Sequence, residues 1–268
     1  EYTNIINMVM KNPSIEMKDF FYGNRALAHE NIGNYKDAIS DWTQTIKIDS
    51  KDPNNYSNRG DCYVIEGNFI MALRDYEMAI EVASESEKAT HYNNLASFYD
   101  DRGDDELALS NWAKVIEVST NDEEIARALN NRANTYWNIS DWDLCIKEYT
   151  KAIEFDSSDV YFSNRARAYE FKAIWEFDEI EKSELYEKSL ADLNTSIELA
   201  EKIEMYEVGG LAKLYSRRGD IYTELSEDTK ALPDYNHAIN ISEGYDKANA
   251  LTTRGIWHQE KGRYDKSL

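Results

Sequence analysis

Cysteine, proline and long apolar runs are all scarce in this chain of 268 residues. The two cysteines, Cys62 and Cys145, are too few for a disulfide framework, and they stand where other copies of an internal repeat carry small or apolar residues. We expect both to be buried thiols, which favours a reducing compartment such as the cytoplasm over secretion. No apolar run approaches the roughly 20 residues that a membrane-spanning helix needs.

Positive charge is also scarce, with 30 basic against 51 acidic residues and a formal net charge of −21. A surface this acidic repels phosphate backbones, so we expect no nucleic-acid ligand. At long range the same charge attracts basic partners. The alternative is that the acidic residues only keep an elongated protein soluble.

Sequence motifs for catalysis are missing as well. The chain has no metal-ligand spacing, no glycine-rich phosphate loop and no nucleophile elbow. Its four histidines are scattered along the chain: His29, His91, His237 and His258. The sequence therefore predicts a protein that is not an enzyme and that has no metal site and no cofactor.

A tripeptide of the form Asn-Arg-Ala or Asn-Arg-Gly recurs along the chain. Clear copies and weaker echoes begin at Asn24, Asn58, Asn94, Asn131, Asn164, Arg217 and Thr253. Their third residues stand at 26, 60, 96, 133, 166, 219 and 255, so the steps are 34, 36, 37, 33, 53 and 36. A period of roughly 34 residues indicates stacked two-helix units, for which binding is the default function.

Each copy contains two apolar stripes at helical spacing. In the second copy Tyr56, Gly60 and Tyr63 mark one face of a first helix, and Ala72 and Tyr76 mark one face of a second helix. A Gly-Asn or Gly-Asp pair separates the two stripes at 33–34, 67–68 and 103–104. Such a pair ends one helix with a left-handed residue and turns the chain into the next helix.

This pattern resembles the tetratricopeptide repeat family, over residues 19 to 268. The resemblance implies an all-α, right-handed superhelical solenoid of antiparallel helix pairs, with about six full repeats plus partial end units. Arginine mostly replaces the usual leucine of the first helix, and the usual closing proline is absent from the clear copies. The expected repeats span 19–52, 53–88, 89–125, 126–158, 159–211, 212–247 and, in part, 248–268.

Two expectations concern the ends of the chain. Residues 1–18 are expected to form an N-terminal helix that packs on the array. The chain starts at Glu1 and stops at Leu268, just where a second helix would begin. We therefore expect it to be part of a longer protein.

The repeat at 159–211 carries an insertion. The segment from Tyr169 to Tyr186 is longer than the corresponding segment of the sibling repeats, so we expect both helices to extend beyond the stack. Two alternatives remain for the apolar residues of the insertion, such as Trp175 and Ile180. They pack on the lengthened second helix around Leu185 and Ile203, or they form an exposed ledge for a partner or a second copy of the chain.

An arginine stands on the core face of the first helix in five copies, and an unpaired buried charge is costly. A carboxylate follows each arginine at one constant spacing once the insertion is discounted, whereas the copy with Leu95 has the neutral Asn111. We predict structural ion pairs with the second helix of the same or the neighbouring repeat. The pairs are Arg25 with Asp41, Arg59 with Asp75, Arg132 with Glu148, Arg165 with Asp192, and Arg218 with Asp234.

In the tetratricopeptide family the first helices line a concave groove. Five positions that would face this groove are asparagine: Asn24, Asn58, Asn94, Asn131 and Asn164. A side-chain amide both donates and accepts, which suits the backbone of an extended peptide. The array resembles the asparagine ladder in the repeat arm of O-GlcNAc transferase. The alternative is that these asparagines cap helices or bridge residues within a repeat.

Cations occupy other groove positions of the later repeats, and they suggest contact with an anion or a carboxylate. Their placement partly resembles the carboxylate clamp with which some tetratricopeptide proteins hold the C-terminus of heat-shock chaperones. Four of its five positions match, at Asn134, Asn164, Lys213 and Arg217, and Asn130 replaces the fifth, a lysine. The predicted anion contacts are Arg127, Asn134, Arg167, Lys213 and Arg217.

The sequence thus predicts a non-catalytic protein–protein interaction scaffold. It would bind an extended peptide or protein segment in the concave groove. The alternatives are a peptide-sensing regulatory module, a substrate-targeting arm of a larger protein, and a structural part that uses the convex face or the insertion.

Overall fold

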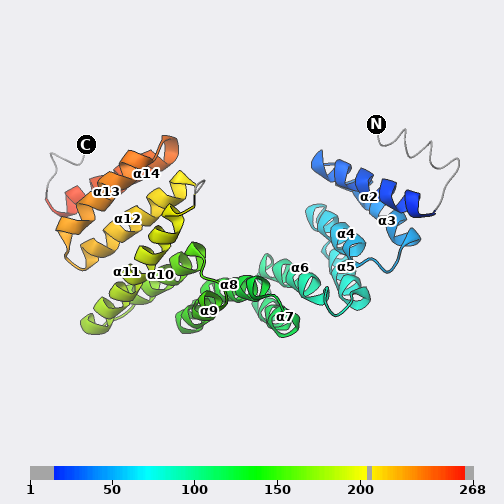
Figure 1. Cartoon of the computed structure of the whole chain (residues 1–268), viewed down its shortest axis with the longest axis horizontal. Helices are drawn as coiled ribbons and strands as arrows, with labels where there is room; N and C mark the ends of the chain where they lie inside the picture. Colours follow the sequence, from blue (N-terminus) through cyan, green and yellow to red (C-terminus); the bar gives the residue numbers. More distant parts are fainter. Residues whose placement is uncertain (1–14, 204–206, 263–268) are drawn as a thin grey trace. The chain divides into compact units, whose positions relative to one another are not determined.

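The structure is a computed structural model, and it describes residues 15–203 and 207–262. Every regular element in these two ranges is an α-helix (Figure 1), which confirms the predicted all-α fold. The helices are α2 (Ile15–Asn31), α3 (Tyr35–Ile48), α4 (Pro53–Ile65), α5 (Phe69–Val82), α6 (Lys88–Asp100), α7 (Asp105–Val118), α8 (Asp122–Asn138), α9 (Trp142–Phe155), α10 (Asp159–Ile174), α11 (Glu179–Glu201), α12 (Val208–Glu224), α13 (Asp228–Ile241) and α14 (Gly244–Glu260).

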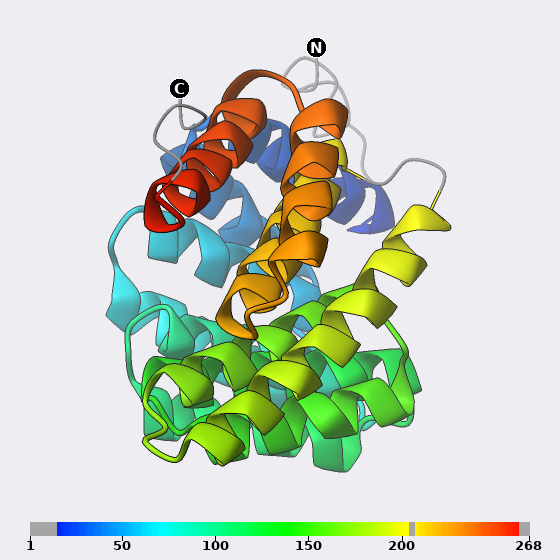
Figure 2. The ribbon, with the colours of Figure 1, turned by 90° about the vertical axis from the view of Figure 1, so that its left-hand side faces the viewer.

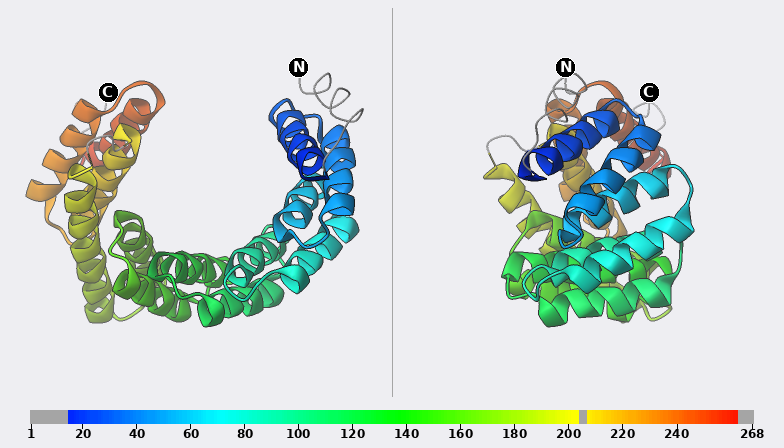
Figure 3. Two further views of the ribbon diagram at one scale, coloured as in Figure 1. Left: turned by 45° about the vertical axis from the view of Figure 1, so that its right-hand side comes forward. Right: turned by 90° about the vertical axis from the view of Figure 1, so that its right-hand side faces the viewer.

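The chain divides into two compact units, and the boundary between Ala128 and Leu129 falls inside α8. In the first unit α2, α4 and α6 each pack against the helix that follows, and α3 and α5 also contact the first helix of the next pair (Figure 3). In the second unit α9 to α14 continue this pattern (Figure 2). We call α2, α4, α6, α8, α10, α12 and α14 the first helices, and the others the second helices.

The turns inside the helix pairs contain the left-handed residue that the sequence predicts. Gly33 has a φ of 75°, and the amide of the next residue, Asn34, donates to the His29 carbonyl at 2.8 Å. This left-handed residue closes α2 and starts the turn into α3. In the second unit Ser140 and Ser226 adopt the same left-handed conformation, with φ of 61° and 60°.

Small residues lie where the paired helices approach most closely. The alanines Ala26, Ala38, Ala72 and Ala108 are fully buried. At Gly219 an added Cβ would lie 2.6 Å from the Tyr235 ring, so this position accepts only glycine without a shift of the aromatic ring. At Gly219 the core therefore packs a large aromatic of the second helix against a small residue of the first.

Several first helices begin earlier than expected. Helices α2, α8, α12 and α14 begin at 15, 122, 208 and 244, each four residues before the predicted repeat starts at 19, 126, 212 and 248. Residues 15–18 thus belong to α2 and not to a separate helix over 1–18, and residues 1–14 lie outside the described residues. In α8 the extra turn carries Asp122, Glu123 and Glu124, and acidic side chains stabilise a helix N-terminus.

The insertion lengthens both helices of its repeat, as predicted, and α11 has 23 residues. Of the two alternatives for the insertion, the structure does not show the first, in which Trp175 and Ile180 pack around Leu185 and Ile203. Trp175 is 69% exposed and Ile180 is 73% exposed, whereas Leu185 is buried. The turn between α10 and α11 also carries Phe177, which is 94% exposed. The structure therefore shows the alternative, an exposed apolar ledge.

Candidate functional site

All five predicted arginine–carboxylate pairs are present, each with the second helix of the same repeat. Arg59 donates from Nε and Nη2 to the two carboxylate oxygens of Asp75 at 2.7 and 2.8 Å. The side chain of Asp75 is 2% exposed and that of Arg59 is 13% exposed. A buried two-point pair of this kind fixes the distance and rotation between two helices.

A second contact of these arginines was missed from the sequence. The remaining nitrogen of Arg59 donates to Thr43 Oγ1 at 3.1 Å, and that of Arg165 donates to Thr150 Oγ1 at 3.1 Å. Thr43 and Thr150 lie on the second helix of the preceding repeat. Each of these two guanidinium groups therefore joins three helices, and all three of its nitrogens donate inside the stack.

The copy without arginine has a neutral contact instead. Leu95 and Asn111 are both buried, and Asn111 Nδ2 donates to the Leu107 carbonyl at 2.8 Å. A carboxylate at this position would be buried without a cation, which explains the coupled change of both residues.

The five asparagines are half-buried on the first helices, but their amides differ in what they bind. Asn24 Nδ2 donates to the Phe20 carbonyl at 2.7 Å. Asn164 Nδ2 donates to Asn130 Oδ1 at 2.9 Å, and Asn130 in turn donates to Asn131 at 3.2 Å. Within the described part of the chain, the amides of Asn58 and Asn94 have no such partner. These two lie on α4 and α6 of the first unit.

The predicted anion contacts do not gather in one place. Asn134, Asn164 and Arg167 line a cavity of about 260 Å³, and the Arg167 guanidinium lies 4.6 Å from the centre of the Trp137 ring. Lys213 and Arg217 line a different cavity, of about 280 Å³. Arg127 is exposed and belongs to the first unit.

The second of these cavities is already balanced in charge. Arg217 pairs with Glu170 at 2.7 Å and donates to Ser163 Oγ at 3.0 Å, and Lys213 lies 3.6 Å from Asp246. Because both cations have carboxylate partners, the four-position match to a carboxylate clamp does not leave two free positive charges there.

A recurring tyrosine contact was also missed. Tyr76 donates to Asp61 at 2.6 Å, and Tyr235 donates to Asp220 at 2.9 Å, in each case across 15 residues. Loss of hydration raises the pKa of Asp220 to about 6, and repulsion from Glu170 adds to the shift, while the Tyr235 hydrogen bond opposes it. The signal in the sequence was an acid directly after the tripeptide.

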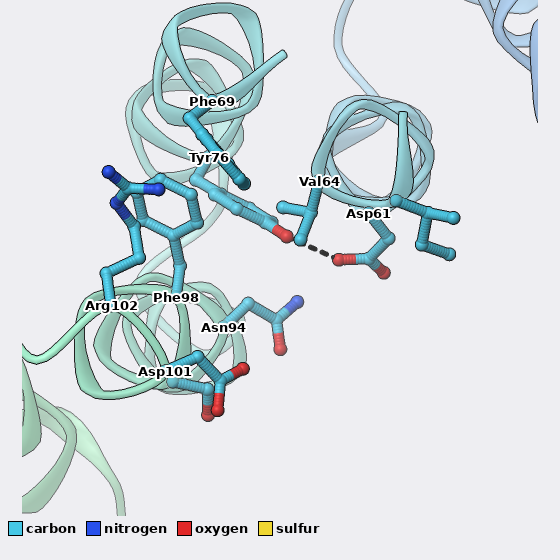
Figure 4. A pocket seen from close by; sticks show the side chains of 10 residues that line it. Asp61, Val64, Phe69, Tyr76, Asn94, Phe98, Asp101 and Arg102 are labelled. Carbon is cyan, nitrogen blue, oxygen red and sulfur yellow. Dashed lines mark hydrogen bonds between the residues drawn. The ribbon is translucent and has the colours of Figure 1, made fainter. Parts of the chain in front are cut away.

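A cavity of about 640 Å³ lies in the first unit between α4, α5 and α6. Figure 4 shows Tyr76 reaching across to Asp61, with Asn94 pointing into the space between α4 and α6. Of the asparagines, Asn94 is the one that lines this cavity. The sequence indicated no cavity here, because its apolar lining has the same spacing as a core.

Two kinds of feature are absent from the described residues, a metal-binding cluster and a membrane-spanning helix. No group of three or more His, Cys, Asp or Glu side chains is placed to hold a metal ion in that part of the chain. None of its helices is both long and apolar enough to cross a membrane.

Comparison with known proteins agrees with this architecture. A family model for the tetratricopeptide repeat matches residues 126–159 and 212–245. A tetratricopeptide repeat protein from Parabacteroides merdae superposes with a TM-score of 0.60 at 19% identity, over 94% of this chain and 90% of that one. The C-terminal part of a repeat-containing protein from Cytophaga hutchinsonii gives 0.67 at 16% identity, over 93% and 94%.

Similarity in sequence to curated proteins is local. The chain is 44% identical over 63 residues to mouse sperm-associated antigen 1, covering 24% of this chain and 7% of that protein. It is 30% identical over 88 residues to human DnaJ homolog subfamily C member 7 (33% and 17%). Hsp70-Hsp90 organizing protein 2 of Arabidopsis thaliana is 32% identical over 91 residues (34% and 16%). The chain thus spans less than a fifth of these relatives.

The paired helices and their solved structural counterparts define an all-α repeat solenoid, the class of fold that presents rows of first helices for binding. Two of its repeats, at residues 126–159 and 212–245, match the tetratricopeptide repeat family, and the chain has the fold of the solved tetratricopeptide repeat proteins.

Proposed function

We propose that this protein is an interaction scaffold that holds an extended peptide segment along its first helices and carries out no chemistry of its own. The observation that carries the proposal is the pair Asn58 and Asn94. They occupy the same repeat position on adjoining first helices, and their half-buried amides have no hydrogen-bond partner in the described residues. An amide can donate to and accept from one peptide group of a bound chain.

The surrounding residues support this assignment. All three guanidinium nitrogens of Arg59 and of Arg165 donate to a carboxylate or a threonine hydroxyl, so these arginines keep the first helices in place. The asparagines of the second unit bridge to one another, so the backbone contact is strongest in the first unit.

The test uses a panel of short, fluorescently labelled peptides with unrelated side chains, measured by anisotropy. Replacing Asn58 and Asn94 together by alanine should weaken binding of every peptide by a similar factor, because amides contact the backbone. Each neutral hydrogen bond contributes roughly 1 kcal/mol to binding. Loss of the bonds from both asparagines should therefore raise Kd by about tenfold or more.

Gln44→Ala is the matched control, because it removes a half-buried amide from the second helix α3. Unchanged affinity in the Asn58/Asn94 variant would mean that the partner uses another surface.

The cavity of Asn134, Asn164 and Arg167 supports one extension of this function, contact with an acidic side chain or a C-terminal carboxylate. The cation of this cavity, Arg167, lies over the Trp137 ring, whereas Lys213 and Arg217 pair with carboxylates. Arg167→Ala should therefore weaken the binding of acidic peptides and reduce its salt dependence, while Lys213→Ala should have a smaller effect. The reverse order of effects would argue against the extension.

A further inference from the structure

We propose that the 640 Å³ cavity between α4, α5 and α6 selects an apolar side chain that has a lysine or arginine two residues away in the bound segment. This inference rests on the proposed function and adds a sequence preference to it.

The cavity has a buried aromatic floor and an exposed apolar mouth. Tyr76 and Phe98 form the floor, with ring centres 5.5 Å apart, and they are 4% and 6% exposed. Ile65 and Phe69 lie at the mouth and are 58% and 40% exposed. Binding is favoured when an apolar side chain of the ligand covers apolar side chains at the mouth of a preformed cavity, because apolar surface is removed from water.

The size of the cavity fits part of a peptide. Its volume of about 640 Å³ lies within the range of roughly 300–1,000 Å³ that ligand cavities have. The walls come from three packed helices, and the Tyr76–Asp61 hydrogen bond ties α5 to α4 across the floor (Figure 4). The cavity is thus formed before a ligand arrives.

The charge around the cavity is negative. Asp61 and Asp101 line it, and both are exposed. The one basic side chain among its lining residues, Arg102, lies 4.1 Å from the centre of the Phe69 ring and 3.8 Å from Asp104. With a net charge of −21 on the chain, an anionic ligand is disfavoured here and a cationic one is attracted.

Asn94 fixes the register of the ligand. Its amide points into the cavity, where it can hold the backbone of an extended segment (Figure 4). In an extended chain side chains alternate between the two faces, so residues two positions apart point the same way. An apolar side chain that enters between Ile65 and Phe69 then places the residue two positions along beside Asp61 or Asp101.

The experiment uses three labelled, N-acetylated alanine-based peptides that differ at two positions. The first has leucine and lysine two residues apart, the second has alanine in place of leucine, and the third has glutamate in place of lysine. We expect the first to bind at least about tenfold more tightly than either of the others. The penalty for glutamate should shrink at high salt, whereas the penalty for alanine should not.

Variants of the protein test the same point from the other side. Phe69→Ser and Asp101→Asn should each reduce the preference for the leucine–lysine peptide. Ile70→Ser is the control for the first, since Ile70 is 84% exposed and does not line the cavity. Glu106→Gln, an exposed acid on α7, is the control for the second. Ile65→Ser also removes an apolar side chain from the mouth of the cavity. Because Ile65 is 58% exposed, this change should affect folding little.

The outcomes separate the two proposals. Equal binding of all three peptides, with loss of binding in the Asn58/Asn94 variant, would overturn the cavity preference and leave the scaffold function intact. A leucine–lysine preference that survives Phe69→Ser and Ile65→Ser would also overturn it. If none of the peptides binds, both proposals fail.

Discussion

Arg165 and Asp192 form the same two-point ion pair, at 2.8 and 2.7 Å, that Arg59 and Asp75 form, although 27 residues separate them instead of 16. The additional residues therefore extend α10 and α11 without changing the register between them. This pair fixes where the helices cross, and the insertion is accommodated beyond that crossing.

The ion pairs are expected to be strongly coupled. Arg59→Leu alone, or Asp75→Asn alone, should destabilise the protein by roughly 3–5 kcal/mol, because a buried charge loses its partner. The double variant should recover much of that loss, as the natural Leu95 and Asn111 copy indicates. Urea unfolding of the four proteins gives the coupling free energy, and strictly additive losses would rule out the pairing as a stabilising unit.

Two glycines on first helices should respond oppositely to alanine. At Gly219 an added Cβ meets the Tyr235 ring at 2.6 Å, and overpacking of this kind costs about 1–3 kcal/mol. At Gly23 the nearest atom, on Trp42, lies 3.6 Å away, so Gly23→Ala gains roughly 0.5–1 kcal/mol from helix propensity. Thermal unfolding should show a lower Tm for the first variant and a higher one for the second. A rise in both would mean that the Tyr235 ring relaxes freely.

The sequence predicted the fold and the ion pairs because both depend on regular spacing. Apolar residues at helical period define which face of a helix is covered, and an acid at a constant spacing after each arginine defines a partner. Spacing does not tell whether a neighbour exists to cover an apolar residue, and for this reason the sequence left open whether Trp175 and Ile180 are packed or exposed. The cavity beside Asn94 was missed for the same reason. The threonine contact of Arg59 depends on the preceding repeat, so no single copy contains it.

The exposed ledge should contribute little to folding. Replacing Trp175 and Phe177 together by serine should change the free energy of unfolding by less than about 0.5 kcal/mol per site, because both side chains already face solvent. Phe171→Ser is the contrasting variant, since its ring lies 4.6 Å from the centre of Trp137 and should cost more than about 1 kcal/mol. A large loss of stability in the Trp175/Phe177 variant would show that the ledge is covered in solution.

Asp220 should make the stability of the second unit depend on pH. Its pKa in the folded protein is about 6, above the ordinary value of 3.8, because packing removes part of its hydration. The residue remains exposed on one side, while one carboxylate oxygen accepts from Tyr235. Since the folded state holds this proton more tightly, the contribution of Asp220 to stability is full below about pH 4 and is lost as the pH rises through 6.

The test is the difference in Tm between the wild-type protein and Asp220→Asn, which cancels the titration of the other carboxylates. Asparagine is compatible with the site, because Asn134 accepts the same hydrogen bond from Tyr149 in another repeat. The variant should therefore gain stability relative to the wild-type protein between about pH 4 and pH 6, and the gain should level off above that. An NMR titration of the Asp220 carboxyl carbon should have its midpoint near 6. A midpoint near 4, with a Tm difference independent of pH, would show that the carboxylate is fully hydrated.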